Sequence, residues 1–400
     1  MTMRISSLTM HQQAVNAILK QQSELSLTQT QVASGRRVQT AADDPVAVVQ
    51  LQALTRMQAQ QEQYSKNAVA ATDRLQLEEQ AMADSTTVLQ RVRELTLQAN
   101  TATVTDADRS YIATEIRARI GELQGIANRR DNNGDYLFAG FSAGTQPFVR
   151  DASGAVIFVG DTGQRQVQID TAVSVPDGDS GAGVYAAVPA GNGVFTTSAD
   201  AANTGSGSVD VGTIVNRANW VPDSYTVTFT SATTWQVTNA ASTVVAAGTY
   251  TAGAAISFNG VQVSVTGTPQ SGDRFHVDAA NVTDIFSGMQ DLASALEQGA
   301  TGDAARAQLT TALGGTLQQL DQSLASISDT RARIGARLSL VQDMDATRET
   351  RQTDITSSIS QLRDLDYASA ISKMNQQMVS LQAAQQAYVK IAGLSLFNYL

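Results

Sequence analysis

Apolar residues recur every three or four positions over long stretches near both ends of this 400-residue chain. One series runs from residue 54 to 99 without a glycine or proline, and a second lies between 313 and 341. A repeat of this kind predicts amphipathic helices with one buried face. The first series comprises Leu54, Met57, Gln61, Tyr64, Ala68, Ala71, Leu75, Glu78, Met82, Ser85, Leu89, Val92, Thr96 and Ala99. The second comprises Leu313, Leu317, Leu320, Leu324, Ile327, Arg331, Ile334, Leu338 and Val341.

Shorter series at the two ends keep the same spacing but include polar members, among them His11, Gln22, Gln29 and Gln385. Polar residues in such a seam weaken packing of the isolated helices and can specify register once a partner is present. We therefore expect an assembly seam at the chain ends. Its predicted members are Leu8, Val15, Ile18, Leu25, Ile371, Met374, Met378, Leu381 and Tyr388.

The middle of the chain follows a different pattern. Over residues 224–278 the apolar positions alternate with period two, as in Tyr225, Val227 and Phe229, and turn residues such as Asn259-Gly260 separate the runs. This alternation predicts antiparallel strands with one buried face. Residues 176–210 have few large apolar groups, which indicates surface loop with short strands.

Together these patterns predict an α + β protein: a long antiparallel helical rod or coiled coil formed by both termini, with an inserted, mainly antiparallel β domain. We expect N-terminal coiled coil over 1–45, a helical arm over 46–150, the β insert over 151–280, a second arm over 281–365 and C-terminal coiled coil over 366–400. A coiled-coil dimer with a globular middle is the alternative arrangement. The Ala, Gln and Ser content of the seams favours pairing within one chain.

Composition excludes several kinds of chemistry. The chain has no cysteine and only two histidines, His11 and His276, so thiolate metal sites, cysteine nucleophiles and paired-histidine sites are not expected. A net charge of −10 argues against a nucleic-acid binder. The charge is uneven, because residues 151–280 hold ten Asp, three Arg and no Lys or Glu. We expect no transmembrane helix and no cleaved secretory signal, since no apolar run is long enough.

Four local motifs invite a chemical interpretation, and in each the structural interpretation is favoured. Residues 181–186 fit GxGxxA but lack the flanking strand and helix of a dinucleotide loop. Asp131, Asn133 and Asp135 have the first spacings of a calcium loop, without its glycine and terminal glutamate, and predict a turn. Asp43-Asp44 before Pro45 predicts a helix N-terminus. Glu78-Glu79 is assigned to a solvated helix face. We predict no catalytic, cofactor-binding or metal-binding residue.

Several segments taken in order resemble the flagellin superfamily, in particular its branch of hook–filament junction proteins. The resemblance covers about residues 1–145 and 285–400. Its N-terminal signature runs from Val32 to Pro45, a second motif spans Asn133 to Gly140, and the C-terminal part includes Asp364 to Ala368 and the closing seven residues. The motif residues are Ser34, Gly35, Arg36, Asp43, Asp44, Pro45, Gly134, Asp135, Tyr136, Phe138, Gly140, Phe397, Asn398 and Tyr399.

The resemblance implies a non-enzymatic structural adaptor of the bacterial flagellum, secreted unfolded through the flagellar type III apparatus. It implies a homo-oligomeric ring, with the other junction protein (FlgK), flagellin and the export chaperone FlgN as partners. No membrane or nucleic-acid partner and no cofactor is implied. The absence of cysteine suits a chain that travels unfolded, and the weak terminal heptads suit helices that fold on assembly.

Two other hypotheses remain at this stage. The first is a filament flagellin, which has similar arms. The features that favour the junction branch over a filament flagellin are Pro45, the Tyr136-Leu137-Phe138 motif and the Phe397-Asn398-Tyr399 ending. The second is an enzyme or surface-binding module housed in residues 151–280, for which the only motivation is a β domain rich in Asp and Thr.

Overall fold

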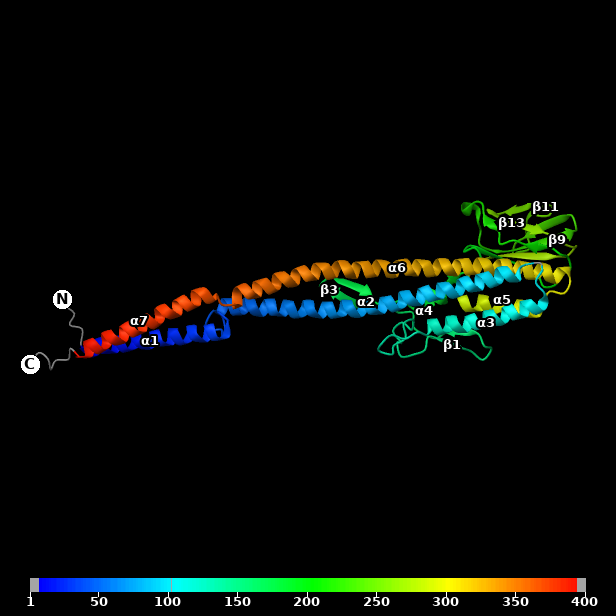
Figure 1. Cartoon of the computed structure of the whole chain (residues 1–400). Coiled ribbons are helices and arrows are strands. Elements are labelled where there is room, and N and C mark those ends of the chain that lie inside the picture. Colours follow the sequence, from blue (N-terminus) through cyan, green and yellow to red (C-terminus); the bar gives the residue numbers. More distant parts are fainter. Residues whose placement is uncertain (1–6, 102, 394–400) are drawn as a thin grey trace, which may run out of the picture. The chain divides into compact units, whose positions relative to one another are not determined.

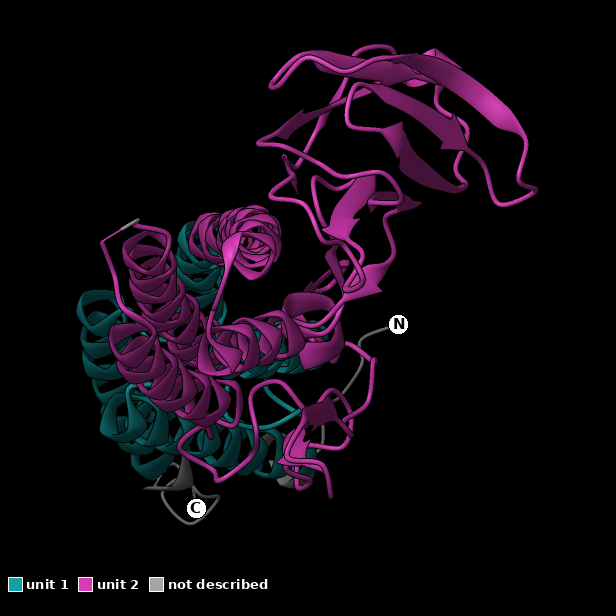
Figure 2. Ribbon diagram, turned by 90° about the vertical axis from the view of Figure 1, so that its right-hand side faces the viewer, with its two compact units in different colours: residues 1–66, 344–400 teal, residues 67–343 magenta. Residues whose placement is uncertain are grey.

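The computed structural model describes residues 7–101 and 103–393. Contacts divide the chain into two compact units (Figure 2). Unit 1 comprises residues 1–66 with 344–400, and unit 2 comprises residues 67–343. The division falls inside two continuous helices, so each of these helices contributes to both units.

Helices dominate both ends of the chain, as the apolar spacing predicts (Figure 1). The two long helices run straight through the predicted series, and the glycine pair Gly314-Gly315 interrupts neither. From Gln61 onward every member of the first series is buried, whereas Leu54 is half-buried and Met57 is exposed. The helices are α1 (Ser7–Ser34), α2 (Pro45–Ala99), α3 (Asp106–Ala127), α4 (Gly181–Tyr185), α5 (Ile285–Gln298), α6 (Asp303–Arg363) and α7 (Tyr367–Gly393).

Helix α3 begins with a complete capping box. The Asp108 amide donates to Thr105 Oγ1, and the Thr105 amide donates to Asp108 Oδ2, both at 3.2 Å. This arrangement satisfies two backbone donors at the helix start. The apolar face of α3 lies in the same hydrophobic core as residues of α5 and α2.

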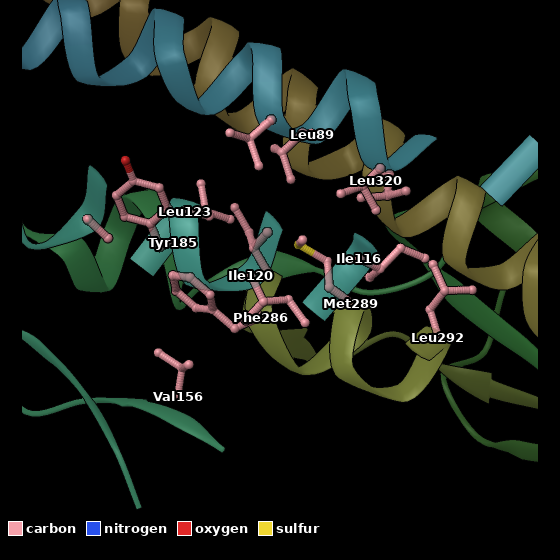
Figure 3. Packing of buried hydrophobic residues seen from close by; sticks show 14 of the residues in the cluster. Leu89, Ile116, Ile120, Leu123, Val156, Tyr185, Phe286, Met289, Leu292 and Leu320 are labelled. Carbon is pink, nitrogen blue, oxygen red and sulfur yellow. The ribbon is translucent and has the colours of Figure 1, made fainter. Parts of the chain in front are cut away.

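A single hydrophobic core joins the helices of unit 2 (Figure 3). Fully buried Leu89 of α2, Ile116 of α3, Phe286 of α5 and Leu320 of α6 contribute to it. Residues 148–188, which the sequence analysis divided between an arm and the insert, also supply side chains to this core. Phe148 and Tyr185 lie there with ring centroids 5.6 Å apart, so this part of the insert folds with the helices.

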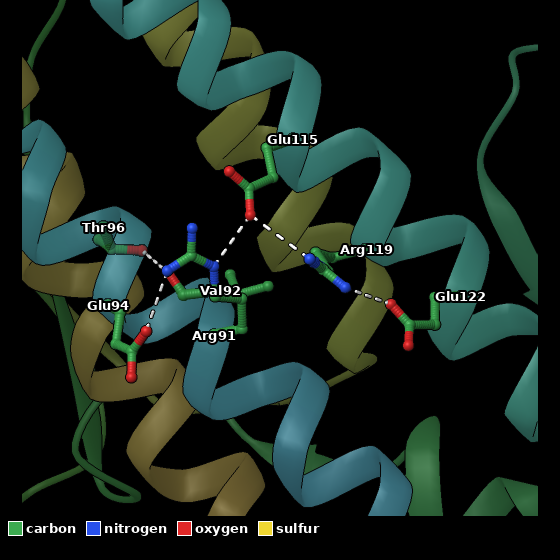
Figure 4. A network of polar contacts seen from close by, with 7 residues as sticks. All are labelled: Arg91, Val92, Glu94, Thr96, Glu115, Arg119 and Glu122. Carbon is green, nitrogen blue, oxygen red and sulfur yellow. Dashed lines mark hydrogen bonds and ion pairs between the residues drawn. The ribbon is translucent and has the colours of Figure 1, made fainter.

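Exposed ion pairs line the outside of the same helices (Figure 4). Arg91 Nε of α2 lies 2.9 Å from Glu115 Oε1 of α3, and Arg119 Nη1 lies 2.7 Å from Glu122 Oε2. Arg117 pairs with Glu297 of α5 at 2.7 Å. Pairs this exposed contribute little to stability because water screens them, so the apolar core holds the helices together.

The β domain of unit 2 has two antiparallel sheets and a core of its own. The larger sheet has the strand order β11-β10-β9-β14-β6, and the smaller has the order β12-β13-β7 with β8 also paired to β13. Tyr225, Val227 and Phe229 face inward and are fully buried, as the alternation predicts. The strands are β6 (Phe195–Ala199), β7 (Ser208–Val209), β8 (Thr213–Ile214), β9 (Ser224–Ser231), β10 (Thr234–Thr238), β11 (Val244–Thr249), β12 (Ala255–Phe258), β13 (Val261–Thr266) and β14 (Arg274–Ala279), with the 3₁₀ helix η1 (Arg217–Asn219) between β8 and β9.

Three further two-stranded sheets are antiparallel and lie outside this sandwich. They pair β1 (Phe148–Arg150) with β2 (Val156–Phe158), β3 (Gln166–Asp170) with β4 (Val173–Pro176), and β5 (Val188–Pro189) with β15 (Val282–Thr283). The predicted turn Asn259-Gly260 connects β12 to β13. Both residues have positive φ, +42° and +79°, as a two-residue hairpin of this type requires.

Candidate assembly site

The N-terminal motif forms the connection between α1 and α2, and in unit 1 it lies against the connection between α6 and α7. Arg36 and Asp364 form a β-bridge. The Arg37 amide donates to the Arg363 carbonyl at 2.7 Å, and the Leu365 amide donates to the Gly35 carbonyl at 3.0 Å. The two chain ends are thus joined by backbone hydrogen bonds at this pair of helix breaks.

Gly35 is required at this place for two reasons. Its φ is +70°, in the left-handed region that favours glycine. A Cβ atom there would also lie only 2.8 Å from the Tyr367 hydroxyl oxygen. The residue that ends α1 therefore also determines how closely the first residue of α7 approaches.

Charged residues of the motif start α2. Asp44 Oδ1 accepts from the Ala47 amide at 2.9 Å, and Pro45 is the first residue of the helix, where its missing N–H costs nothing. Asp43 Oδ2 accepts from the amides of Gln39 and Thr40. Backbone amides lower the pKa of both carboxyls, chiefly that of Thr40 for Asp43 and that of Ala47 for Asp44. The predicted helix N-terminus at Asp43-Asp44 is confirmed.

Arg37 connects the start of α2 to the C-terminal end of α6. Its Nη2 donates to the Leu362 carbonyl at 2.7 Å, while its Nη1 lies 3.3 Å from Asp44 Oδ2. Ser34 Oγ accepts from the Arg36 amide at 3.3 Å. The motif therefore acts as a joint between helices within this unit.

Helices α1 and α7 lie side by side and run antiparallel (Figure 1). Gly35 and Tyr367 mark one end of the pair, and at the other end His11 and Tyr388 pack edge to face with ring centroids 5.7 Å apart. Of the predicted seam, Ile18, Leu25, Met374, Met378, Leu381 and Tyr388 are half-buried.

Two predicted seam residues, Val15 and Ile371, are instead exposed, by 39% and 43%. Gln21 and Thr28 face inward where Gln22 and Gln29 were expected. The inward positions keep the seven-residue repeat, but positions 14, 21 and 28 of α1 and 370, 377 and 384 of α7 each come one residue before the predicted member. The predicted repeat therefore has the right period, and the face that packs is turned by one residue because small and polar side chains occupy half of it. The Leu8 side chain and Phe397, Asn398 and Tyr399 lie outside the described residues.

The α1–α7 pair leaves much apolar surface uncovered. Within the described part of the two helices, the fully buried residues are Thr28, Ala370 and Gln377, none of them large and apolar. Leu19, Val379 and Val389 are 57%, 66% and 69% exposed. The start of α2 adds Val46, Val49, Ala53 and Met57, all exposed and spaced by three or four residues on one helix face. These positions are available to other chains.

The second motif, Gly134 to Gly140, lies in unit 2 after α3. Phe138 is fully buried beside Tyr185, and the Phe138 carbonyl accepts from the Gly181 amide at 2.9 Å. Gly140 has φ +65°, and a Cβ there would collide with the Asp161 carbonyl oxygen. Gly134 also has positive φ, within the turn that follows Asp131. This motif is a packed loop that joins α3 to the sheet segments.

Asp131 explains the calcium-like spacing. Its Oδ1 accepts from the amides of Asn133 and Asp135 at 2.9 and 3.0 Å, and its Oδ2 lies 2.6 Å from Arg74 Nη1. The carboxylate is thus occupied by protein donors, as the predicted turn requires. Among the described residues no group of acidic or histidine side chains is arranged to hold a metal ion. None of the described helices is long and apolar enough to cross a membrane.

A buried polar network, which we call the clasp, surrounds this motif and comprises Arg74, Glu78, Asp131, Asp179 and Arg337. Arg74 Nη2 donates to the carbonyls of Tyr136 and Leu137. Arg337 of α6 binds Asp179 with two hydrogen bonds of 2.9 Å. The Asp179 amide donates to Glu78 Oε1 at 2.9 Å. The clasp thereby connects α2, α6, the motif loop and the segment before α4.

The assignment of Glu78 to a solvated face is wrong. Glu78 is 1% exposed, whereas Glu79 is half-exposed and pairs with Arg331 of α6 at 2.6 Å. Burial, aided by the nearby Asp179 charge, raises the pKa of Glu78 to about 8. The signal for this position was present in the sequence, because Glu78 is a charged member of the buried apolar series. Its partners are distant in sequence and could not be identified from spacing.

Comparisons with known proteins agree with these features. The model of the bacterial flagellin N-terminal helical region matches residues 5–143, and that of the C-terminal helical region matches residues 308–400. The D2-like domain of flagellar hook-associated protein 1 matches residues 198–279, which is the β sandwich. Flagellar hook-associated protein 3 of Escherichia coli is 26% identical over 397 residues, covering 99% of each chain.

A solved structure of Xanthomonas campestris FlgL is 30% identical, with a TM-score of 0.73, over 77% of this chain and 99% of that one. A flagellin of Escherichia coli is 34% identical over only 124 residues, which is 31% of this chain and 25% of that protein. The likeness to flagellin is therefore confined to a part of the chain, while the likeness to hook-associated protein 3 extends over all of it. The chain belongs to the FlgL family, the flagellar hook-associated protein 3 family of structural proteins at the hook–filament junction.

Proposed function

We propose that this protein is a non-enzymatic structural adaptor that forms a homo-oligomeric ring at the hook–filament junction. In this proposal it lies between hook-associated protein 1 (FlgK) and flagellin, outside the cell. It is exported unfolded through the flagellar type III apparatus, with FlgN as its cytoplasmic chaperone. The predicted seam and the predicted helical segments 1–45 and 366–400 are the parts that contact other subunits.

One observation carries the proposal. The helices at the two chain ends are paired, yet in their described parts no large apolar side chain is fully buried. Exposed positions such as Leu19, Val379 and Val389 are unfavourable on a free monomer and become favourable once neighbouring subunits cover them. A polar-interrupted pair of this kind gains most of its stability from partners. Folding of the ends is thereby coupled to assembly.

The β sandwich has a separate role in this proposal. Its core is closed and self-contained, and residues 151–280 carry most of the net negative charge. Such a domain has little need of neighbours and suits the solvent-facing outside of a tube. A spacer role is favoured over a catalytic one.

The test is a deletion strain complemented with variants. Loss of the gene is expected to leave cells with hooks but without filaments, with flagellin lost to the medium. Wild type and Tyr111→Ala, a change at an exposed α3 position of unit 2, should restore filaments, and Leu381→Asp in α7 should not. Normal filaments in the deletion strain would contradict the proposal. Long filaments grown from purified protein on seeds would favour a filament role.

Limited proteolysis of the monomer tests the coupled folding separately. Roughly the first and last 40 residues should be removed quickly, because weakly packed chain ends open first. Ends that resist the protease as long as the unit 2 core would contradict folding on assembly.

A further inference from the structure

The clasp contains two buried polar atoms that the protein does not satisfy. Arg74 Nε and Glu78 Oε2 are each fully buried and have no hydrogen-bond partner among the described residues. All the other polar atoms of these two side chains are engaged, by Asp131, by the carbonyls of Tyr136 and Leu137, and by the Asp179 amide. Buried polar atoms left unpaired destabilise a folded protein, because they lose the hydrogen bonds that water makes in the unfolded chain.

The two atoms converge on the same place, the open side of Gly178. A Cβ atom built on Gly178 would lie 3.5 Å from Arg74 Nε, 3.8 Å from Glu78 Oε2 and 3.7 Å from the Leu137 carbonyl oxygen. Arg74 Nε, Glu78 Oε2 and the Leu137 carbonyl oxygen therefore all lie close to the same side of Gly178, where the residue has no side chain. Three polar partners are what a buried water molecule requires.

We propose that a structural water molecule lies beside Gly178, where it accepts from Arg74 Nε, donates to the Leu137 carbonyl and hydrogen-bonds to Glu78 Oε2. The proposal concerns the internal construction of unit 2 and does not depend on the proposed function.

The water has a consequence for the clasp. Glu78 and Arg74 lie four residues apart on α2, and the nearest charges from other elements are those of Asp179, Arg337 and Asp131. A bridging water connects the Arg74–Asp131 pair to the Glu78–Asp179–Arg337 group. The five charged groups then form one continuous network from α2 to α6.

Substitution of Gly178 by alanine tests the proposal through the sign of its effect. The backbone of Gly178 is not in the left-handed region, and the added methyl group would make only ordinary contacts. Without a water at this place, Gly178→Ala should raise the melting temperature, because alanine reduces the freedom of the unfolded chain. With the water present, the methyl group displaces it and leaves both polar atoms unpaired, so the melting temperature should fall by several degrees.

Gly183→Ala is the matched control. Gly183 lies in α4, five residues away, has no neighbour within 4 Å of a built Cβ, and also lacks positive φ. It should raise the melting temperature slightly. A fall for Gly178→Ala together with a rise for Gly183→Ala supports the water, and a rise for both overturns it.

A crystal structure of the full chain provides the second measurement. At a resolution of about 1.5 Å, ordered density within 2.7–3.2 Å of Arg74 Nε and Glu78 Oε2 is expected. Empty density there, with Glu78 Oε2 bonded directly to the Leu137 carbonyl or to Arg74 Nε, would overturn the proposal.

Discussion

The two units use α-helices in opposite ways. In unit 2, α2 and α6 enclose large side chains such as Leu75, Met82 and Phe286, which are fully buried. In unit 1, the α1–α7 pair encloses small or polar residues and leaves leucines and valines exposed. The difference is whether apolar side chains of the same chain cover the apolar face of each helix. Unit 2 closes its own core, while the terminal pair leaves part of its apolar surface for other subunits.

The largest effect that tests this difference is expected from a cavity created in the core of unit 2. Phe286→Ala should lower the free energy of unfolding by about 3–5 kcal/mol, because the side chain is fully enclosed in the helical core. Tyr111→Ala on α3 is the control, since that ring is 74% exposed and its loss should cost no more than about 0.5 kcal/mol. Denaturant titrations of both variants give the comparison. Equal losses would mean that the core does not carry the stability of this unit.

A second test concerns the charge buried in that core. The pKa of Glu78 is raised to about 8, above its ordinary 4.5, so the folded state binds a proton that the unfolded state releases. The stability that this proton provides is complete below about pH 4.5 and is lost as pH rises towards 8. Glu78→Gln should remove this dependence. Relative to wild type, the variant should gain on the order of 2–4 kcal/mol between pH 5 and pH 8.5.

Denaturant unfolding at pH 5, 6.5 and 8.5 measures the effect, with Glu79→Gln as the matched control. Glu79 is the neighbouring carboxyl on the same helix and is half-exposed, so its substitution controls for the loss of one acidic side chain. A parallel pH dependence of wild type and Glu78→Gln would show that Glu78 is ionised in the folded protein.

A third, smaller effect is expected at the joint of unit 1. Gly35→Ala forces an L-residue into positive φ and brings its Cβ against the Tyr367 hydroxyl, at a cost of about 1–2 kcal/mol. Hydrogen exchange should quicken at the Leu365 amide, which bonds the Gly35 carbonyl. Adding Tyr367→Phe to the Gly35→Ala variant should restore the part of the lost stability that is due to the contact with the hydroxyl group. Unchanged exchange at Leu365 would show that the joint tolerates the new side chain.

The smallest effect on the monomer is expected in the terminal pair. Leu381→Asp should change the main thermal transition very little, because Leu381 is only half-buried between two weakly packed helices. The same change should prevent assembly. Calorimetry of the purified monomer measures the first outcome. A loss comparable to that of Phe286→Ala would place α7 in a preformed core and remove the distinction between the units.

Much of the fold could be predicted because it depends on local periodicity. The apolar series from Gln61 to Ala99 specifies the buried face of α2, and Tyr225, Val227 and Phe229 specify the inner face of β9. The capping residues Thr105 and Asp108 specify where α3 begins. These features need only neighbouring residues, so a single sequence contains them.

Other features needed the folded chain. Residues 148–188 share the composition of the insert, yet Phe148 and Tyr185 are buried among helices, because packing and not composition decides which core a side chain enters. The clasp joins Arg74 to Asp131, and Asp179 to Arg337, residues separated by 57 and 158 positions. Val15 and Ile371 are exposed because Ala14 and Ala370, one residue earlier, take the inward positions, so apolarity alone did not identify the face that packs.

The sequence by itself thus determined the long helices and the strands of the β domain, since each depends on residue spacing, and its ordered motifs resembled the family that the comparisons identify. Only the tertiary structure decided which charges are buried, where the β core begins and which apolar residues remain uncovered. The physical reason is that burial depends on what lies opposite a side chain. For Glu78 the opposite groups come from α6 and from the segment before α4, and no spacing along the chain records that they meet there.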